Sequence, residues 1–471
     1  MAKPKEDLPE AYELGTDFKP TLDFLNRLEN GQQVVVISPY PTINGLECQL
    51  RKVHRNFIFE SPSIKHGEGY EPVEYQSDQY GFGKPFELDN GEALMHIPNG
   101  LSEFRYNLSD VDGKISYLES NYAREVTYCR VLMPLDKDDN YPLSYIESVS
   151  YKVNGMFYAK GLFILERLKQ PLVIYRVTIS DKTYVVVDSK SLIHPEEFKA
   201  SVDAVLLAFG LISGCLLSSE RLVLQSRTAD FSIINGFMFE RLRPTIHGYH
   251  IVDPMLHRHY YNLETRVFFP RFIYEDLVSA ILNCSDFNRC VSLIVESSSY
   301  PVYIRASTYS VALETIKNII VEDKKESIKP IKNPSDAKTI RENLNKVLDD
   351  IEDDRLFNDK SILYKRIVQI NQLTNRDSLL MSFRLVGIDL SEEDIRCINY
   401  RNDFLHGRIP FTPSEDADDF EMTKAVFKLR LLVVSLLLKR VNYQGALLNY
   451  FSYICLRRYK SKPIEPLFKM I

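Results

Sequence analysis

The sequence predicts an α+β protein with several domains, in which a β-rich N-terminal region is followed by an all-α bundle of helices. The chain has 471 residues, more than a single hydrophobic core usually supports. Short runs rich in Val, Ile, Tyr and Phe, separated by Gly, Pro, Asn and Asp, fill residues 32–190. From about residue 269 the apolar residues instead recur at helical spacing. We therefore expect a β-rich domain at residues 1–194, a mixed α/β connection at 195–264 and a helical domain at 265–471.

The N-terminal domain begins with a polar lead over residues 1–30 that contains one short helix at 21–28. Strands are predicted where β-branched and aromatic residues cluster between turn residues, at residues 33–38, 47–53, 56–60, 127–133, 145–151 and 156–165. A hairpin is predicted from a strand at 172–179 to a strand at 183–188. Gly and Pro are concentrated in residues 61–100, which predicts long loops there.

The connection and the C-terminal domain add helices. Residues 195–217 predict a helix with Pro at its first position, followed by strands at 221–225, 231–239 and 246–252. Apolar residues at positions 309, 312, 313, 316, 319 and 320 follow the rhythm of a half-buried helix. After a loop at 322–334, further helices are predicted from residue 335 and at 360–373, 376–386, 392–405, 415–439 and 445–459. Several helices joined by short loops favour a bundle.

Composition and charge predict a cytoplasmic protein that does not enter a membrane. The seven cysteines are scattered without a C-x-x-C pair, which indicates reduced thiols. The N-terminus is polar and lacks the apolar core of a signal peptide. Residues 311–471 hold 27 basic and 24 acidic residues, whereas residues 1–310 hold 31 basic and 40 acidic ones. The C-terminal part can therefore tolerate an RNA ligand better than the N-terminal part.

The helix predicted at residues 392–405 has clear signals at both ends. Ser391 and Asp394 form the pattern of a capping box, and Gly407 is placed to let the chain leave in the left-handed conformation. On an ideal helix, the buried face is predicted to include Ile395, Ile398 and Leu405, with Asn402 inside it and His406 at its edge. Arg401 lies about 140° from His406 at about 100° per residue. Two copies of the helix across a dimer could supply both groups to one site.

The residues at this helix end suit a reaction at a phosphate. Arginine matches a phosphate with two parallel hydrogen bonds, and histidine exchanges a proton near neutral pH. The segment Arg401-Asn402-x-x-x-His406, with Arg376-Asp377-Ser378-Leu379-Leu380, Gly387-Ile388 and Ala312-Leu313-Glu314 before it, resembles the HEPN ribonucleases. Ala312-Leu313-Glu314 is similar to a stretch in Apea-like members of that family, and a β-rich part ahead of such a domain is similar to ApeA-type antiphage defence proteins. The resemblance spans residues 265–471.

The resemblance implies a helical bundle that dimerises and cuts RNA without a metal or other cofactor, leaving 2′,3′-cyclic phosphate ends. His406 would transfer the proton, Arg401 would bind the scissile phosphate, and Asn402 would orient His406 or the phosphate. Glu314 and Asp403 would support the site, and the residues expected to bind RNA are Arg408, Arg457, Arg458 and Lys460. The expected partners are an RNA substrate such as tRNA, a second or further copies of the chain, and a phage-derived trigger protein. The N-terminal region would restrain the nuclease until infection.

Other interpretations of the same residues stay open. The chain can be a non-catalytic dimeric scaffold with the HEPN fold, in which Arg401 pairs with Asp403 or Glu393 and His406 caps carbonyl groups. A nuclease that acts on DNA is a further alternative. The histidines at 247, 250, 257 and 259 suggest a metal site, but their spacing fits a strand or loop better than a tetrahedral site on a helix.

Overall fold

The computed structural model of the chain divides into two compact units, Met1–Leu282 and Asn283–Ile471. It describes residues 11–15, 18–37, 47–53, 56–60, 86–89, 94–97, 101–107, 110–115, 117–120, 124–135, 142–179, 182–217, 220–241, 245–324, 328–351, 359–411, 418–457 and 465–471. The first unit holds the large sheet and the second holds most of the helices, so the fold is α+β with more than one domain. Residues 195–264, expected as a separate connection, belong to the first unit.

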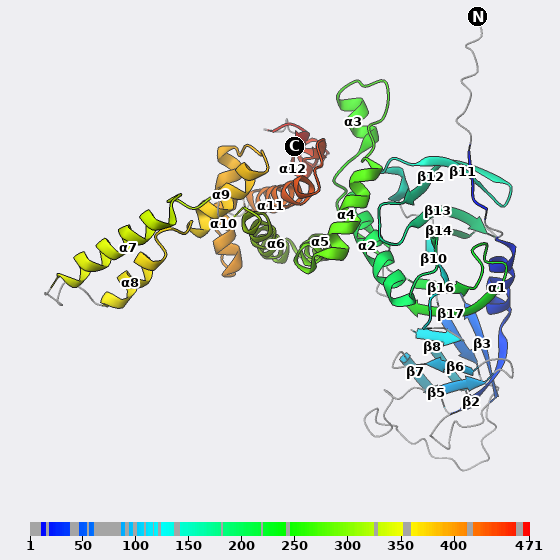
Figure 1. Cartoon of the computed structure of the whole chain (residues 1–471). Helices are drawn as coiled ribbons and strands as arrows, with labels where there is room; N and C mark the ends of the chain where they lie inside the picture. Colours follow the sequence, from blue (N-terminus) through cyan, green and yellow to red (C-terminus); the bar gives the residue numbers. More distant parts are fainter. Residues whose placement is uncertain are drawn as a thin grey trace, which may run out of the picture. The chain divides into compact units, whose positions relative to one another are not determined.

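Unit 1 is built on one large sheet, whose strands follow the order β1-β11-β12-β13-β14-β10-β16-β17-β9-β6-β5-β2-β3-β4-β8-β7 (Figure 1). Only β1 and β11 pair in parallel among the described neighbours, and the other pairs are antiparallel. The strands are β1 Tyr12–Glu13, β2 Gln32–Ile37, β3 Glu47–Val53, β4 Asn56–Glu60, β5 Phe86–Asp89, β6 Leu94–Ile97, β7 Leu101–Asn107, β8 Asp110–Ile115, β9 Tyr117–Ser120, β10 Tyr128–Leu135, β11 Val149–Val153, β12 Met156–Leu165, β13 Leu172–Ile179, β14 Lys182–Ser189, β16 Glu220–Ser226 and β17 Ile234–Arg241.

Several predicted segments of unit 1 differ from the structure. The helix predicted at 195–217 ends at Ser213, because Gly214 caps it in the left-handed conformation and Cys215–Leu216 form strand β15. Residues 61–100 are not all loop, because β5 and β6 lie within them, and the rest of that stretch is outside the described residues. The strand predicted at 145–151 begins later, at Val149 of β11. Residues 145–148 follow the 3-10 turn η1 (Pro142–Ser144) and are not part of a strand. The backbone there pairs instead with Phe269, whose N–H donates to Tyr145 O at 2.9 Å. The strand predicted at 246–252 is reduced to β18, Ile246–His247, which pairs with β15, Cys215–Leu216.

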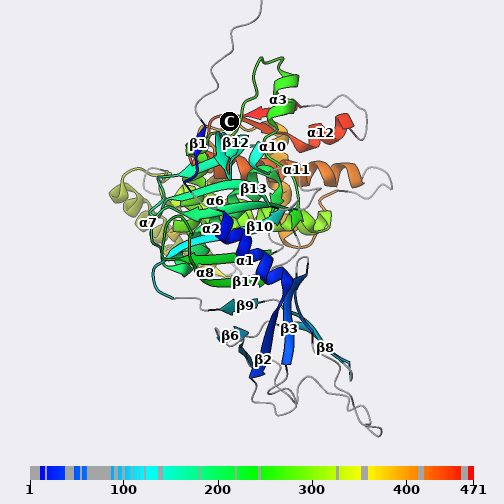
Figure 2. The same cartoon turned by 90° about the vertical axis from the view of Figure 1, so that its right-hand side faces the viewer.

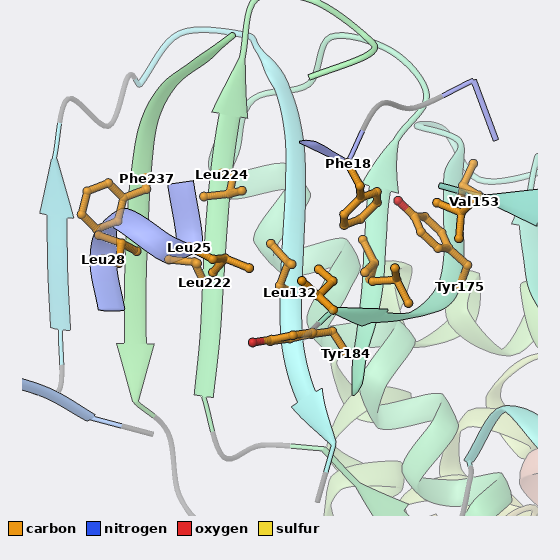
Figure 3. Packing of buried hydrophobic residues seen from close by; sticks show 14 of the residues in the cluster. Phe18, Leu25, Leu28, Leu132, Val153, Tyr175, Tyr184, Leu222, Leu224 and Phe237 are labelled. Carbon is orange, nitrogen blue, oxygen red and sulfur yellow. The ribbon is translucent and has the colours of Figure 1, made fainter. Parts of the chain in front are cut away.

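Helices cover both faces of the central strands. Helix α1 (Lys19–Asn30) places Leu25 and Leu28 in a buried cluster that also contains Leu162 of the sheet. Figure 3 shows Leu25 and Leu28 beside Leu222 of this cluster, and Figure 2 shows the helix lying across the strands. Neighbouring side chains of a strand point to opposite faces, and Phe163 contacts Phe209 of helix α2 (Pro195–Ser213). Helices α3 (Pro254–Tyr260) and α4 (Arg271–Asn283) complete the unit.

A buried arginine joins α1 to the sheet. Arg130 of β10 is fully buried and donates two hydrogen bonds to Asp188, at 2.8 and 2.9 Å. Its third nitrogen donates to Thr21 Oγ1 at 2.9 Å. The guanidinium lies 4.3 Å from the ring centre of Phe18 and 4.1 Å from that of Phe231. A planar cation suits this environment because it can stack on rings and form paired hydrogen bonds at the same time.

Unit 2 is a helical bundle arranged around α6 and α11 (Figure 1). Helix α6 packs against α5, α9, α10 and α11. The helices are α5 Ser285–Glu296, α6 Val302–Glu322, α7 Pro334–Asp349, α8 Lys360–Val368, α9 Asn375–Leu385, α10 Glu392–Leu405, α11 Asp418–Arg440 and α12 Tyr450–Arg457. The helix predicted at 445–459 is shorter, because β19 (Ala446–Leu448) pairs with β20 (Phe468–Met470) at the chain end. Within the described residues, no helix has both the length and the apolar content needed to cross a bilayer.

Candidate functional site

Local interactions set both ends of α10, as predicted from the sequence. Ser391 Oγ accepts from the Asp394 N–H at 3.1 Å, and Asp394 Oδ2 accepts from the Ser391 N–H at 3.1 Å, which completes the capping box. At the other end Gly407 has φ +69, a conformation that an L side chain rarely adopts. The N–H groups of Gly407 and Arg408 donate to Phe404 O and Asp403 O at 3.1 and 2.7 Å. The helix therefore ends at a defined place, with His406 as its last capping residue.

The buried face of α10 is rotated from the predicted one. The buried side chains are those of Asp394, Cys397, Ile398, Arg401 and Phe404. Leu405, expected in the core, is 39% exposed, and Asn402 is exposed as well. Of the predicted Ile395, Ile398 and Leu405, only Ile398 is buried, because α10 packs against both α6 and α11 with the side that carries Arg401. Burial raises the pKa of the Cys397 thiol to about 12, which makes this cysteine a poor nucleophile.

Arg401 is held by a residue of α6. Its side chain is 4% exposed, and its Nε lies 2.6 Å from Glu314 Oε1. The second oxygen of Glu314 accepts from Lys317 Nζ at 2.8 Å. Lys317 also donates to Asn375 Oδ1 at 2.8 Å. Two cations thus share one carboxylate, so the arginine pairs with Glu314 rather than with Asp403 or Glu393.

The exposed part of the site lies at the end of α10. Arg401 Nη1 donates to Asn402 Oδ1 at 2.7 Å, so the buried arginine orients an exposed amide. Ser307 Oγ of α6 donates to Phe404 O at 2.8 Å and holds the last helical turn. The His406 side chain is exposed just beyond that turn. The structure therefore brings the side chains of Glu314, Arg401 and Asn402 into contact. His406 follows Asn402 by four positions and is exposed.

The remaining predicted residues are placed as follows. Asp403 is half-buried, and its carbonyl accepts hydrogen bonds from the N–H groups of His406 and Arg408. Arg408 is exposed after the helix end. Arg457 is exposed on α12, with its guanidinium 5.5 Å from the ring centre of Tyr453. Arg458 and Lys460 lie outside the described residues.

Three residues of the site escaped the sequence analysis: Ser307, Lys317 and Asn375. Lys317 follows Glu314 by three positions, a spacing that brings side chains together on one helix face, so it had a detectable signal. Ser307 and Asn375 have no comparable local signal, because each acts on a different helix from its own.

A second buried charge network fixes the start of α10. Asp394 Oδ1 lies 2.8 Å from Lys428 Nζ, and Asp394 Oδ2 lies 3.1 Å from Lys469 Nζ. Lys428 also pairs with Glu465. Burial by itself would raise the pKa of Asp394, but the two ammonium groups outweigh burial and hold this pKa below its ordinary value. These contacts tie α10 to α11 and to the C-terminal strand.

The histidines outside α10 do not assemble with other ligands in the described part of the chain. His250 Nε2 lies 3.5 Å from Asp253 Oδ2, and the ring of His257 packs against that of Tyr261. Among the described residues, no group of three or more His, Cys, Asp or Glu is placed to hold a metal ion. Candidate chemistry is therefore concentrated at the end of α10.

No family model, curated protein or solved structure matches this chain. Function is therefore inferred from the residues of α6 and α10 and from the resemblance that their motifs carry.

Proposed function

We propose that unit 2 is a metal-independent endoribonuclease of the HEPN type. The observation that supports this proposal most is the arrangement at the end of α10. Glu314 fixes Arg401, Arg401 orients Asn402, and His406 is exposed after the last turn. An exposed histidine that follows a fixed amide and a buried cation at the same helix end suits a reaction at a phosphodiester.

In the proposed reaction, the ribose 2′-oxygen attacks the adjacent phosphorus and the bond from phosphorus to the 5′-oxygen breaks. The products are a 2′,3′-cyclic phosphate and a free 5′-hydroxyl. The 2′-hydroxyl loses its proton, and the leaving 5′-oxygen gains one. His406 is the group on this chain that transfers a proton, since its ring is exposed and an imidazole can both give and take a proton.

Arg401 takes a different part from the one that the resemblance implies. The resemblance places this arginine on the scissile phosphate, whereas here its guanidinium is buried against Glu314. A direct phosphate contact would require Arg401 to leave that carboxylate. We therefore assign Arg401 the role of a positioning residue in the single chain, acting through Asn402. A phosphate contact by Arg401 belongs to a rearranged or dimeric state.

The resemblance also carries the biological part of the proposal. The substrate would be tRNA or another structured RNA in the cytoplasm, and the active form a homodimer or larger homo-oligomer. The context would be antiphage or abortive-infection defence. Unit 1 would restrain the nuclease until a phage-derived protein releases it.

One observation favours the non-catalytic scaffold as a second candidate. The buried Arg401 and its ion pair with Glu314 join α10 to α6, which is what a purely structural arginine would do. On this reading His406 only ends the helix, and unit 2 serves to assemble copies of the chain.

The decisive experiment compares RNA ends from bacteria that express the wild type or His406→Ala, with and without phage. We expect fragments with 2′,3′-cyclic phosphate ends in the wild type alone. His259→Ala is the matched control, because His259 is an exposed histidine of unit 1. Equal RNA profiles for wild type and a folded His406→Ala, while the wild type still protects the cells, would favour the scaffold.

A further inference from the structure

Unit 1 contains a cavity of about 330 Å³ whose charged lining is entirely basic. The charged residues that line it are Lys160, Arg176 and Arg266, and no carboxylate is among the described residues that do so. This is unusual for its surroundings, since residues 1–310 hold 40 acidic and 31 basic residues. In the described part of the chain, neither Lys160 nor Arg266 forms an ion pair. The cavity therefore concentrates positive charge in an acidic half of the protein.

A distortion of the sheet forms one wall of this cavity. Val149 pairs with Leu162, and Tyr151 pairs with Tyr158, so two steps along β11 correspond to four along β12. The extra residues of this bulge include Lys160 and Gly161. Gly161 has φ +114, a conformation that suits glycine. Bulges occur preferentially near functional sites because they redirect a side chain.

Hydrogen bonds hold the bulge and the opposite wall in place. The Gly161 N–H donates to Ser148 Oγ at 3.0 Å, and Ser150 Oγ donates to Ala159 O at 2.9 Å. Across the cavity, the Phe269 N–H donates to Tyr145 O, and Phe269 O accepts from the Glu147 N–H, both at 2.9 Å. This pairing holds the segment with Arg266 and Phe268 against the turn that carries Ser144. The walls are therefore defined by backbone contacts between distant parts of unit 1.

The lining combines groups that recognise a phosphate with groups that accept an apolar body. Guanidinium and ammonium groups bind phosphate oxygens by charge-assisted hydrogen bonds. Ser148 Oγ accepts from Gly161, so its own proton can be donated to a ligand. The apolar part of the lining consists of Leu143, Ile146, Ala159 and Phe268. A ligand with one anionic end and one flat or apolar end would use both parts.

We propose that this cavity binds a small organic phosphate the size of a mononucleotide. Ligand pockets of drug-sized molecules range from about 300 to 1,000 Å³, and 330 Å³ lies at the lower end. The volume suits a single nucleoside monophosphate better than a dinucleotide or a polymer. Three cations match the two negative charges of a phosphate monoester and leave one for a polar group of the sugar or base. The site is independent of the end of α10.

The test is calorimetric titration of the full-length protein with AMP, GMP, CMP and UMP, with inorganic phosphate and with the uncharged nucleosides. We expect saturable binding of at least one nucleoside monophosphate at one site per chain. Removing one charged partner should weaken that binding about tenfold, so Lys160→Gln and Arg266→Gln should each show this loss. Lys169→Gln is the control, since Lys169 is 86% exposed on the same unit and does not line the cavity. His406→Ala should bind like the wild type, which separates this site from the proposed nuclease site.

The other outcomes overturn the proposal. Absence of saturable binding with all four nucleotides would remove the site. Binding that both cavity variants leave unchanged would place the ligand elsewhere, and loss of that binding in His406→Ala would assign it to the α10 site. Inorganic phosphate bound as tightly as the nucleotides would show a simple anion site without a place for the organic part.

Discussion

Glu314 and Arg401 form a buried ion pair between α6 and α10, with 2.6 Å between Glu314 Oε1 and Arg401 Nε. The two residues belong to separate sequence motifs, Ala312-Leu313-Glu314 and Arg401-Asn402-x-x-x-His406. Their pairing connects the central helix of the bundle to the helix that ends at His406. Because the other oxygen of Glu314 binds Lys317, this one carboxylate balances two buried cations. The stability of unit 2 and the geometry of the candidate site therefore depend on the same side chain.

Replacing Glu314 by Gln should destabilise unit 2 strongly. The change leaves Arg401 and Lys317 buried without a carboxylate, and such losses cost about 3 kcal/mol. The measurement is the unfolding free energy from urea denaturation, followed by far-UV circular dichroism. Glu342→Gln is the control, because Glu342 is 63% exposed and pairs with Lys338 on the surface, where a pair contributes less than about 1 kcal/mol. Equal effects of the two substitutions would show that the buried pair contributes no special stability.

Gly407→Ala should impair RNA cleavage more than it impairs folding. An added Cβ would meet no atom within 4 Å, so the cost is the left-handed backbone alone, about 1 kcal/mol. The chain after Leu405 would shift to relieve this strain, and His406 would move with it. Gly387→Ala is a matched control, since Gly387 also has a positive φ and open space around it. Similar melting temperatures with cleavage lost only in Gly407→Ala would support the prediction, and equal cleavage in both variants would contradict it.

The contribution of Asp394 to stability should depend on pH. Its pKa is lowered in the folded state, so its stabilising effect is complete well above its unfolded pKa of about 4. That effect is lost as the pH falls through the lower, folded pKa. Asp394→Asn should therefore cost about 3 kcal/mol at neutral pH, and the gap to the wild type should narrow below about pH 4.

The measurement is the unfolding free energy of the wild type and of Asp394→Asn at a series of acidic pH values, which gives the difference between the two proteins at each pH. Asp389→Asn is the control, because Asp389 is exposed and forms no ion pair among the described residues. A gap that stays constant down to pH 2 would mean that the Asp394 carboxylate charge is not the source of its stability.

Arg130→Lys should loosen α1 from the sheet of unit 1. Lysine keeps the charge but cannot bond Asp188 with two nitrogens, reach Thr21 and stack between two rings together. We expect a loss of about 2 kcal/mol and faster amide exchange in Lys19–Asn30. Arg227→Lys should have no such effect, since Arg227 is exposed in the turn between β16 and β17 of the same unit. Unchanged exchange in α1 for Arg130→Lys would show that the hydrophobic cluster alone holds this helix.

Segments with local signals were predicted well. The bounds of α10 agree with the prediction because the capping box and Gly407 act within a few residues of the helix ends. The strands β3, β4, β12 and β13 also begin and end where predicted, since turn residues bound their apolar runs. The α+β class followed from the short β-type runs in residues 32–190 and from the helical spacing of apolar residues after about residue 269. Each of these signals lies within a short stretch of chain.

The tertiary structure decided which side chains meet. It turned the buried face of α10 toward Arg401, because α6 supplies a carboxylate at that position and makes burial of the cation favourable. It also replaced the start of a predicted strand by a pairing with Phe269 and assembled the basic cavity from four separate segments. The sequence alone determined the α+β class and the bounds of α10, β3, β4, β12 and β13, because the signals for these lie within short stretches of chain. The partners of Arg401 and Asp394, and the cations that line the cavity with Lys160, come from distant parts of the chain. Only packing in three dimensions brings such groups close enough for their charges and hydrogen bonds to act.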